Sequence, residues 1–212
     1  FGSGGRMKIE RDHARITSGV LGGQTTGGPI ALVLQNLDHE KWRERQIEPM
    51  TIPRPGHADL TGALLFEADA SGANFSGARL VKAHGGGLRM VNGNLSGADL
   101  SFADLQDIRL NDADLRGAKM ENAHLERGRL NRANLNGVKG YEVYLEHAEL
   151  RGATLVGATL KSSSLQHADF ADTDLTDADL SFSNLLSANL GNSRQAGIVL
   201  SGARMPDNSM RP

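Results

Sequence analysis

A five-residue period runs through most of this chain and constrains its fold more than any other feature. Of the 30 positions taken every fifth residue from Leu60 to Met205, Leu, Phe or Met fills 26. The residue two places earlier is small in most repeats, as Ala98 and Ala133 show. Internal repetition of this kind predicts a stacked, quasi-linear architecture in which each unit packs only against its neighbours.

A period of five fits neither an α-helix nor a β-strand. Five residues rotate an α-helix by about 140° beyond a full turn, so the large side chains form no continuous stripe. A strand alternates faces every two residues, so an odd period sends successive leucines to opposite sides. The chain must therefore turn a corner in each repeat, with every large residue pointing inward and neighbouring coils about 4.8 Å apart.

Two repeat units identify a family with this architecture. Residues 98–102 read Ala-Asp-Leu-Ser-Phe and residues 133–137 read Ala-Asn-Leu-Asn-Gly, and both resemble the pentapeptide-repeat family. The resemblance implies an all-β fold, a right-handed quadrilateral β-helix with four repeats per coil. We expect about seven coils over residues 57–205, followed by a tail at residues 206–212.

A few positions of the large column depart from the pattern. Gly85, Gly140 and Gln195 stand where leucine is expected, and His84 is followed by three glycines. We interpret these departures as local slack or a loop that bulges from one corner. A functional loop or a partner contact is the alternative interpretation.

The first 56 residues lack the repeat and form a separate segment. Residues 7–10 and 29–34 predict short strands, with glycine-rich turns between them. Residues 53–60, which read Pro-Arg-Pro-Gly-His-Ala-Asp-Leu, resemble an internal motif of chorismate synthase, and the likeness extends over about residues 1–63. The resemblance implies that His57 would assist a reduced flavin (FMN) and that Arg6 and Arg54 would bind the phosphorylated substrate.

The chorismate synthase resemblance does not predict an active enzyme. The family carries a second histidine in a Gly-Glu-Ser-His-Gly motif, which does not occur in this sequence, and Ser3 stands at a position where arginine is usual. The part that completes the flavin site is replaced by the repeats. Because a catalytic site needs convergent groups held by packed neighbours, we expect no catalysis and no bound cofactor.

The strands of such a fragment normally belong to a larger sheet and would present unpaired edges. We therefore expect residues 1–56 to pair onto the first coil as a cap or to associate with a second chain. The junction satisfies both patterns, since Ala58, Asp59 and Leu60 end the enzyme motif and also form a first repeat.

Outward residues twenty apart should stack into columns along the rod. Arg89, Arg109 and Arg129 form one column, with Arg132 and Arg151 beside it. This surface is either a solvated mixed-charge face or an anion contact. The later repeats carry an acidic cluster that invites comparison with pentapeptide proteins that mimic DNA and protect bacterial topoisomerases; its members are Asp169, Asp172, Asp174, Asp177 and Asp179.

Composition limits the remaining functional classes. The chain has no cysteine, which excludes disulfides and thiolate metal sites. We expect no metal site from His147 and His167, which should stack as a surface pair. Residues 57–205 carry 14 basic and 18 acidic side chains, so direct nucleic-acid binding is not expected. No apolar run approaches the roughly 18 residues of a membrane span, and we expect a cytoplasmic protein.

The sequence therefore predicts a non-catalytic structural or protein-binding rod. A topoisomerase-binding, DNA-mimicking protein and a relic of a flavoenzyme are the two alternatives.

Overall fold

The computed structural model describes residues 13–16, 20–21, 24–25, 32–35 and 58–212. The first four of these segments are short strands that pair in two antiparallel ribbons. Strand β1 (His13–Ile16) pairs with β4 (Leu32–Gln35), and β2 (Val20–Leu21) pairs with β3 (Gln24–Thr25). Strand β4 overlaps the strand predicted at residues 29–34, whereas the one predicted at residues 7–10 lies outside the described residues.

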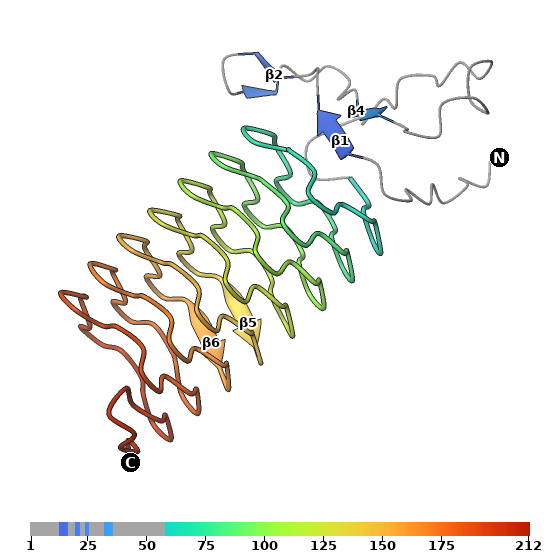
Figure 1. Cartoon of the computed structure of the whole chain (residues 1–212). Coiled ribbons are helices and arrows are strands. Elements are labelled where there is room, and N and C mark those ends of the chain that lie inside the picture. The colour runs from blue at the N-terminus through green and yellow to red at the C-terminus, as the bar shows by residue number, and fades with distance from the viewer. Residues whose placement is uncertain (1–12, 17–19, 22–23, 26–31, 36–57) are drawn as a thin grey trace, which may run out of the picture.

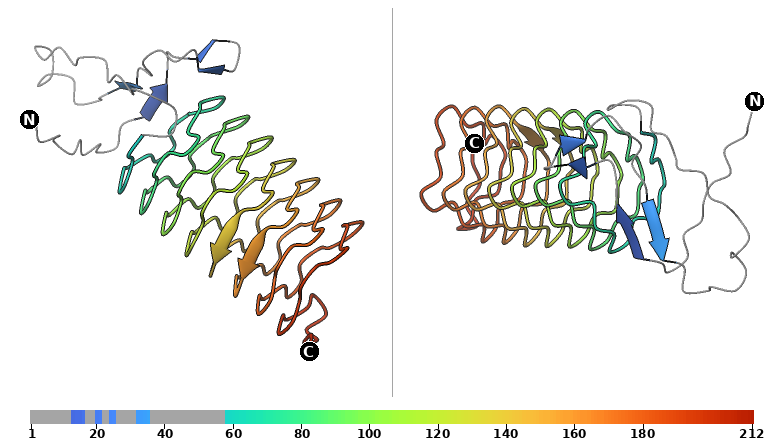
Figure 2. Two further views of the ribbon diagram at one scale, coloured as in Figure 1. Left: turned by 180° about the vertical axis from the view of Figure 1, so that it is seen from behind. Right: turned by 90° about the horizontal axis from the view of Figure 1, so that it is seen from above.

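From residue 58 onward the chain winds into a rod of stacked coils (Figures 1 and 2). Parallel bridges join residues twenty apart along the whole rod, from Asp59 with Arg79 to Asn184 with Arg204. The pairing extends into regular strands only at β5 (Lys139–Tyr141) and β6 (Thr159–Lys161). The predicted four repeats per coil are therefore confirmed.

Four repeats per coil give the rod four faces, which we number by the large inward positions. Face 1 carries positions 60, 80 and so on to 200, and face 2 carries positions 65 to 205. Face 3 carries positions 70 to 190, and face 4 carries positions 75 to 195. Among the described residues, no helix is long and apolar enough to cross a membrane.

The two inward residues of each repeat fill the interior as the sequence predicts. Leu105, Leu125 and Leu145 are fully buried, and the small partner Ala123 is buried beside them. The few polar inward residues have hydrogen-bond partners: the Ser183 hydroxyl donates to the Leu160 carbonyl at 2.7 Å. The core is therefore a continuous column of large apolar side chains, with small residues leaving room for them.

One repeat shows how the backbone closes each corner. The Leu80 amide donates to the Asp99 carbonyl of the next coil at 2.7 Å, and the Arg79 amide donates to the Ala58 carbonyl of the previous coil at 2.8 Å. The Ala83 amide then returns to the Leu80 carbonyl at 3.0 Å, and Lys82 has a φ of 56°. These are the features of a type II turn, and the positive φ recurs at every fifth residue from 62 to 202.

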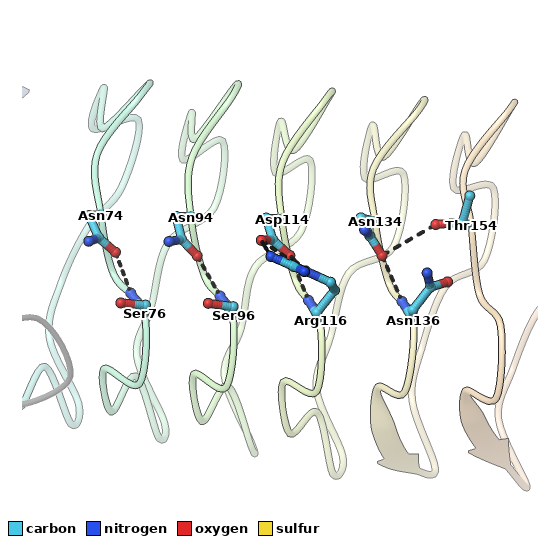
Figure 3. Close-up of polar contacts among 9 residues, drawn as sticks. All are labelled: Asn74, Ser76, Asn94, Ser96, Asp114, Arg116, Asn134, Asn136 and Thr154. Carbon is cyan, nitrogen blue, oxygen red and sulfur yellow. Dashed lines mark hydrogen bonds and ion pairs between the residues drawn. The ribbon is translucent and has the colours of Figure 1, made fainter. Parts of the chain in front are cut away.

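In many repeats an Asp or Asn lies just before the large residue, and its side chain accepts a hydrogen bond from the amide just after the large residue. Figure 3 shows this pattern on face 4, where the Asn94 Oδ1 accepts the Ser96 amide at 3.0 Å and the Asn134 Oδ1 accepts the Asn136 amide at 3.1 Å. Short Asx side chains suit this local bond. This geometry explains the repeated Asp or Asn in the sequence.

The departures from the large column are neither slack nor bulging loops, so our first interpretation is wrong. Pairing twenty residues apart continues through both glycines, from His84 to Asp104 and from β5 to β6. The reason is a compensating side chain three residues later, at the small position of the next repeat. Leu88 and Val143 are buried there.

The space around each glycine is closed by that compensating residue. A Cβ added to Gly85 would lie 3.2 Å from the Leu88 Cδ2 and 2.9 Å from the Leu105 Cδ2. A Cβ added to Gly140 would collide with the Val143 Cγ2. Gln195 follows the same rule, since Ile198 packs against the core three residues after it.

Candidate arginine face

The predicted arginine column exists as a stacked set on face 3. Arg89 bridges Arg109 in the next coil, and Arg109 bridges Arg129 in the coil after that. All three side chains are exposed, and successive coils lie about 4.8 Å apart. Arg132 and Arg151 flank the column, both at the corner that follows face 3.

Acidic neighbours neutralise this column unevenly. The Arg89 Nε lies 3.9 Å from the Asp69 Oδ2, and the Arg129 Nε lies 3.7 Å from the Glu149 Oε1. Within residues 58–212, no ion pair is found for Arg109. The middle of the column therefore carries the least compensated positive charge.

The flanking arginines differ because they are held in short ion pairs. Arg132 donates from its Nε and Nη2 to the two Asp112 carboxylate oxygens, each at 2.7 Å. This hydrogen-bonded guanidinium lowers the pKa of the Asp112 carboxyl below its usual value. The Arg151 Nε lies 2.9 Å from the Asp169 Oδ2, so both flanking cations already have partners.

The fold does not require arginine in this column. At many equivalent positions an Asp or Asn accepts the amide two residues later, but in two coils of face 3 an asparagine of the previous coil accepts that amide instead. The Asn111 Oδ1 accepts the Asn131 amide at 3.2 Å, and the Asn131 Oδ1 accepts the Arg151 amide at 2.9 Å. These acceptors serve the amides of residues 131 and 151, so position 129 is free to carry arginine and position 149 is free to carry glutamate.

Sequence reasoning missed the role of Asn111 and Asn131. Their signal was available, because the two residues are twenty apart in register and each follows a large position. It was not recognised because the bond joins residues of two different coils. That a side-chain oxygen of the previous coil accepts the backbone amide becomes visible only when the stacking of the coils is known.

The family models agree with this architecture. The model for pentapeptide repeats matches three overlapping stretches, residues 94–137, 118–157 and 153–192. The described rod is a pentapeptide-repeat β-helix. The model for chorismate synthase matches residues 1–87, so its last thirty residues lie within the first coils of the repeat rod.

Curated relatives match the N-terminal part of the chain. Chorismate synthase from Caldanaerobacter subterraneus subsp. tengcongensis is 48% identical over 66 residues, which cover 31% of this chain and 19% of that protein. The enzyme from Aquifex aeolicus is 49% identical over 75 residues, with 31% and 19% covered. The chain thus spans about a fifth of the length of the enzymes it matches.

Solved structures match the repeat rod. QnrB1, a plasmid-mediated fluoroquinolone resistance protein, is 19% identical with a TM-score of 0.46, covering 65% of this chain and 80% of that chain. HetL, a pentapeptide repeat protein involved in heterocyst differentiation regulation in Nostoc, is 28% identical with a TM-score of 0.32, covering 73% and 92%.

The acidic cluster does not form a single patch on the pentapeptide-repeat rod. Asp169 and Asp172 belong to face 3 and its corner, Asp174 and Asp177 to face 4 and its corner, and Asp179 to face 1. Several of these carboxylates are also paired, as Asp179 is with Lys161 at 2.9 Å. The cluster therefore wraps around one coil instead of running along the rod.

His147 and His167 stack as the sequence predicts, at the corner that follows face 2, and His124 lies on face 2 itself. The ring centroids of His147 and His167 are 4.7 Å apart, and those of His124 and Tyr144 are 4.3 Å apart. The His124 Nδ1 lies 3.0 Å from the Glu126 Oε1. No group of three or more potential metal ligands is found in the part of the chain that the structure describes.

The three residues assigned by the enzyme resemblance, Arg6, Arg54 and His57, lie outside the described residues. Their roles in a flavin or phosphate site remain predictions from the resemblance. The arginine face is thus the candidate site whose geometry the structure shows.

Proposed function

We propose that the pentapeptide-repeat rod is a non-catalytic binding module and that face 3 binds an acidic segment of a partner protein. The observation that carries the proposal is the Arg89, Arg109 and Arg129 column, whose central guanidinium has no ion pair among residues 58–212. The rigid coil holds these side chains at a fixed spacing, which reduces the ordering cost of binding.

The electrostatics of the column favour an anionic partner. Two cations about 5 Å apart in water repel by something under 1 kcal/mol. A partner carboxylate placed between neighbouring guanidinium groups would turn this repulsion into charge-assisted hydrogen bonds. Arg109 is best placed for such contacts because no carboxylate of the rod occupies it.

An acidic protein segment fits better than a nucleic acid. Residues 57–205 carry 14 basic and 18 acidic side chains, so the rod as a whole repels a polyanion. The outward positions of face 3 also hold no aromatic side chain in the described coils, and stacking platforms are typical of single-strand binders. The local positive column on a net negative rod suits a short acidic contact.

The test is binding of an extended glutamate-rich peptide to the whole chain, measured by titration calorimetry at several salt concentrations. Replacing Arg89, Arg109 and Arg129 together by Gln should abolish binding, whereas the matched replacement of Arg79, Arg116 and Arg194 on other faces should preserve it. Equal losses of peptide affinity in the two variants would contradict the proposal. If single-stranded DNA bound more tightly than the peptide and its binding were lost in the same arginine variant, the partner would be a nucleic acid and not a protein.

A flavin-binding remnant is the second candidate, favoured by the match of residues 1–87 to chorismate synthase. Its residues would be His57 for the flavin and Arg6 and Arg54 for the substrate phosphate. Anaerobic calorimetry with reduced FMN tests it, and a flat titration is the result we expect. A saturable titration that His57→Ala removes would establish the remnant.

We further propose a cytoplasmic location, in keeping with a sequence that has no cysteine. Residues 1–56 are proposed as a second association segment, either as a cap on the first coil or as a contact with another chain. Light scattering distinguishes the two, because only the intermolecular contact gives a mass that rises with concentration.

A further inference from the structure

Exposed aromatic side chains gather along one edge of the rod. Phe102, Tyr141 and Phe182 are 49%, 50% and 68% exposed. All three follow large positions of face 1 and therefore lie at the corner between faces 1 and 2. We name this surface, made by these three residues, the aromatic edge.

Two of these residues share one position of the turn. Phe102 and Phe182 occupy the third position of their type II turns with φ values of 60° and 61°. Gly or Asn suits this position best, and long side chains such as Lys82 and Arg132 also adopt it in this rod. About half or more of each phenylalanine side chain is exposed there, so these rings contribute little to the core.

The spacing of the aromatic edge is regular. Residues 102, 141 and 182 lie in alternate coils, since each coil takes twenty residues. With coils about 4.8 Å apart, the backbone positions of successive members are separated along the rod by about 9.6 Å, with Phe102 and Phe182 at the third position of the turn and Tyr141 at the second. A polyproline II helix advances about 3.1 Å per residue and repeats every three residues, which gives about 9.3 Å per turn.

We propose that the aromatic edge binds a proline-rich segment of a partner in the polyproline II conformation. Each ring would contact one proline face per helical turn, and the two periods would drift apart by only about 0.6 Å over the three rings. Aromatic surfaces are the usual receptors for such segments. The Tyr141 phenol and the Asn122 amide, on the same edge, supply donors for peptide carbonyls that a polyproline helix leaves unbonded.

A second copy of the chain fits this surface less well. The exposed halves of three aromatic side chains offer roughly 300 Å², far below the roughly 800 Å² per partner of a stable interface. The aromatic edge also lies on a different part of the rod from the arginine column of face 3, so the two binding proposals are independent.

The experiment titrates a fluorescent proline-rich peptide with the whole chain and follows anisotropy, using a glycine-serine peptide of equal length and charge as the reference. Saturable binding of the proline-rich peptide alone is expected. The variant carrying Phe102→Gly, Tyr141→Ala and Phe182→Gly should bind about tenfold more weakly or worse, as expected for aromatic anchors. The control is Phe66→Ala, because Phe66 is 51% exposed but lies at another corner, and it should bind as the wild type does.

The glycine substitutions carry a safeguard against misfolding. Because glycine adopts a positive φ without strain, Phe102→Gly and Phe182→Gly should raise the unfolding midpoint or leave it unchanged while binding falls. Absence of saturable binding to the proline-rich peptide would overturn the proposal. So would equal binding by the triple variant and the wild type, or an equal loss in Phe66→Ala.

Discussion

Restoring leucine at position 140 should destabilise the rod, although the repeat pattern predicts leucine there. A Cβ at residue 140 would already meet the Leu160 Cδ2 at 3.1 Å and collide with Val143. Val138 and Val143, both fully buried, occupy the small positions on either side. Gly140→Leu adds four carbon atoms to this closed space, and overpacking of this kind costs about 3 kcal/mol or more.

The same reasoning predicts a rescue. Val138→Ala and Val143→Ala together remove four buried carbon atoms, and each should cost about 2 kcal/mol when made alone. Independent effects would therefore add to a loss of roughly 7 kcal/mol in the triple variant. Because the triple substitution conserves volume, we expect it instead to lose less than about 1.5 kcal/mol.

Equilibrium urea unfolding followed by circular dichroism measures the wild type, the three single variants, the double valine variant and the triple variant. The unfolding slopes must agree, since a change in slope would signal loss of cooperativity along the repeats. A neutral Gly140→Leu variant would refute the packing argument. A triple variant as unstable as the sum of its parts would do the same.

Three further predictions concern the core, the turns and acid stability. Leu125→Ala should lower the free energy of unfolding in urea by about 2–5 kcal/mol, because Leu125 is fully buried. Leu200→Ala should lower it by less, because Leu200 is only partly buried. Equal losses in the two variants would contradict the assignment of Leu125 to the core. Asn134→Ala removes the acceptor of the Asn136 amide and of the Thr154 hydroxyl, so it should cost about 1 kcal/mol, whereas Asn134→Asp should be tolerated in the same assay. Since Arg132 lowers the pKa of Asp112, this pair contributes stability above the unfolded value near 3.9 and loses it as pH falls through the folded pKa. Melting temperatures recorded from about pH 5 downward should therefore fall less steeply for Asp112→Asn than for the wild type, and parallel curves would argue against the pair.

The period of the large residues was sufficient to predict the inward column, which depends only on spacing along the chain. The four repeats per coil, and with them the stacking of Arg89, Arg109 and Arg129, were predicted from the resemblance to the pentapeptide-repeat family. The alternation of Asp and Asn before the large residue was also visible, but its hydrogen bond to the next-but-one amide required the turn geometry. The expectations from the sequence agree with the structure where a residue makes its contacts within its own repeat.

The features that escaped prediction depend on neighbours in other repeats. Gly85 and Gly140 looked like defects because Leu88 and Val143, three residues later, compensate only in three dimensions. The exposure of Phe102 and Phe182 was hidden because their turns place a bulky residue where glycine or a short polar residue is usual. The ribbon of β1 with β4 was only half predicted, because residues 29–34 were expected as a strand but residues 13–16 were not.

The central claim is that the rod acts by binding through face 3, and one coil provides a direct test. Residues 144, 149, 154 and 159 occupy the same outward position on the four faces of the coil beside Arg129, so a photo-crosslinking amino acid can be placed at each in turn within the whole chain without removing an arginine of the column. We expect a defined adduct with the glutamate-rich peptide from position 149 and little from the other three. Equal adducts from all four positions, or the strongest adduct from a face other than face 3, would contradict the account.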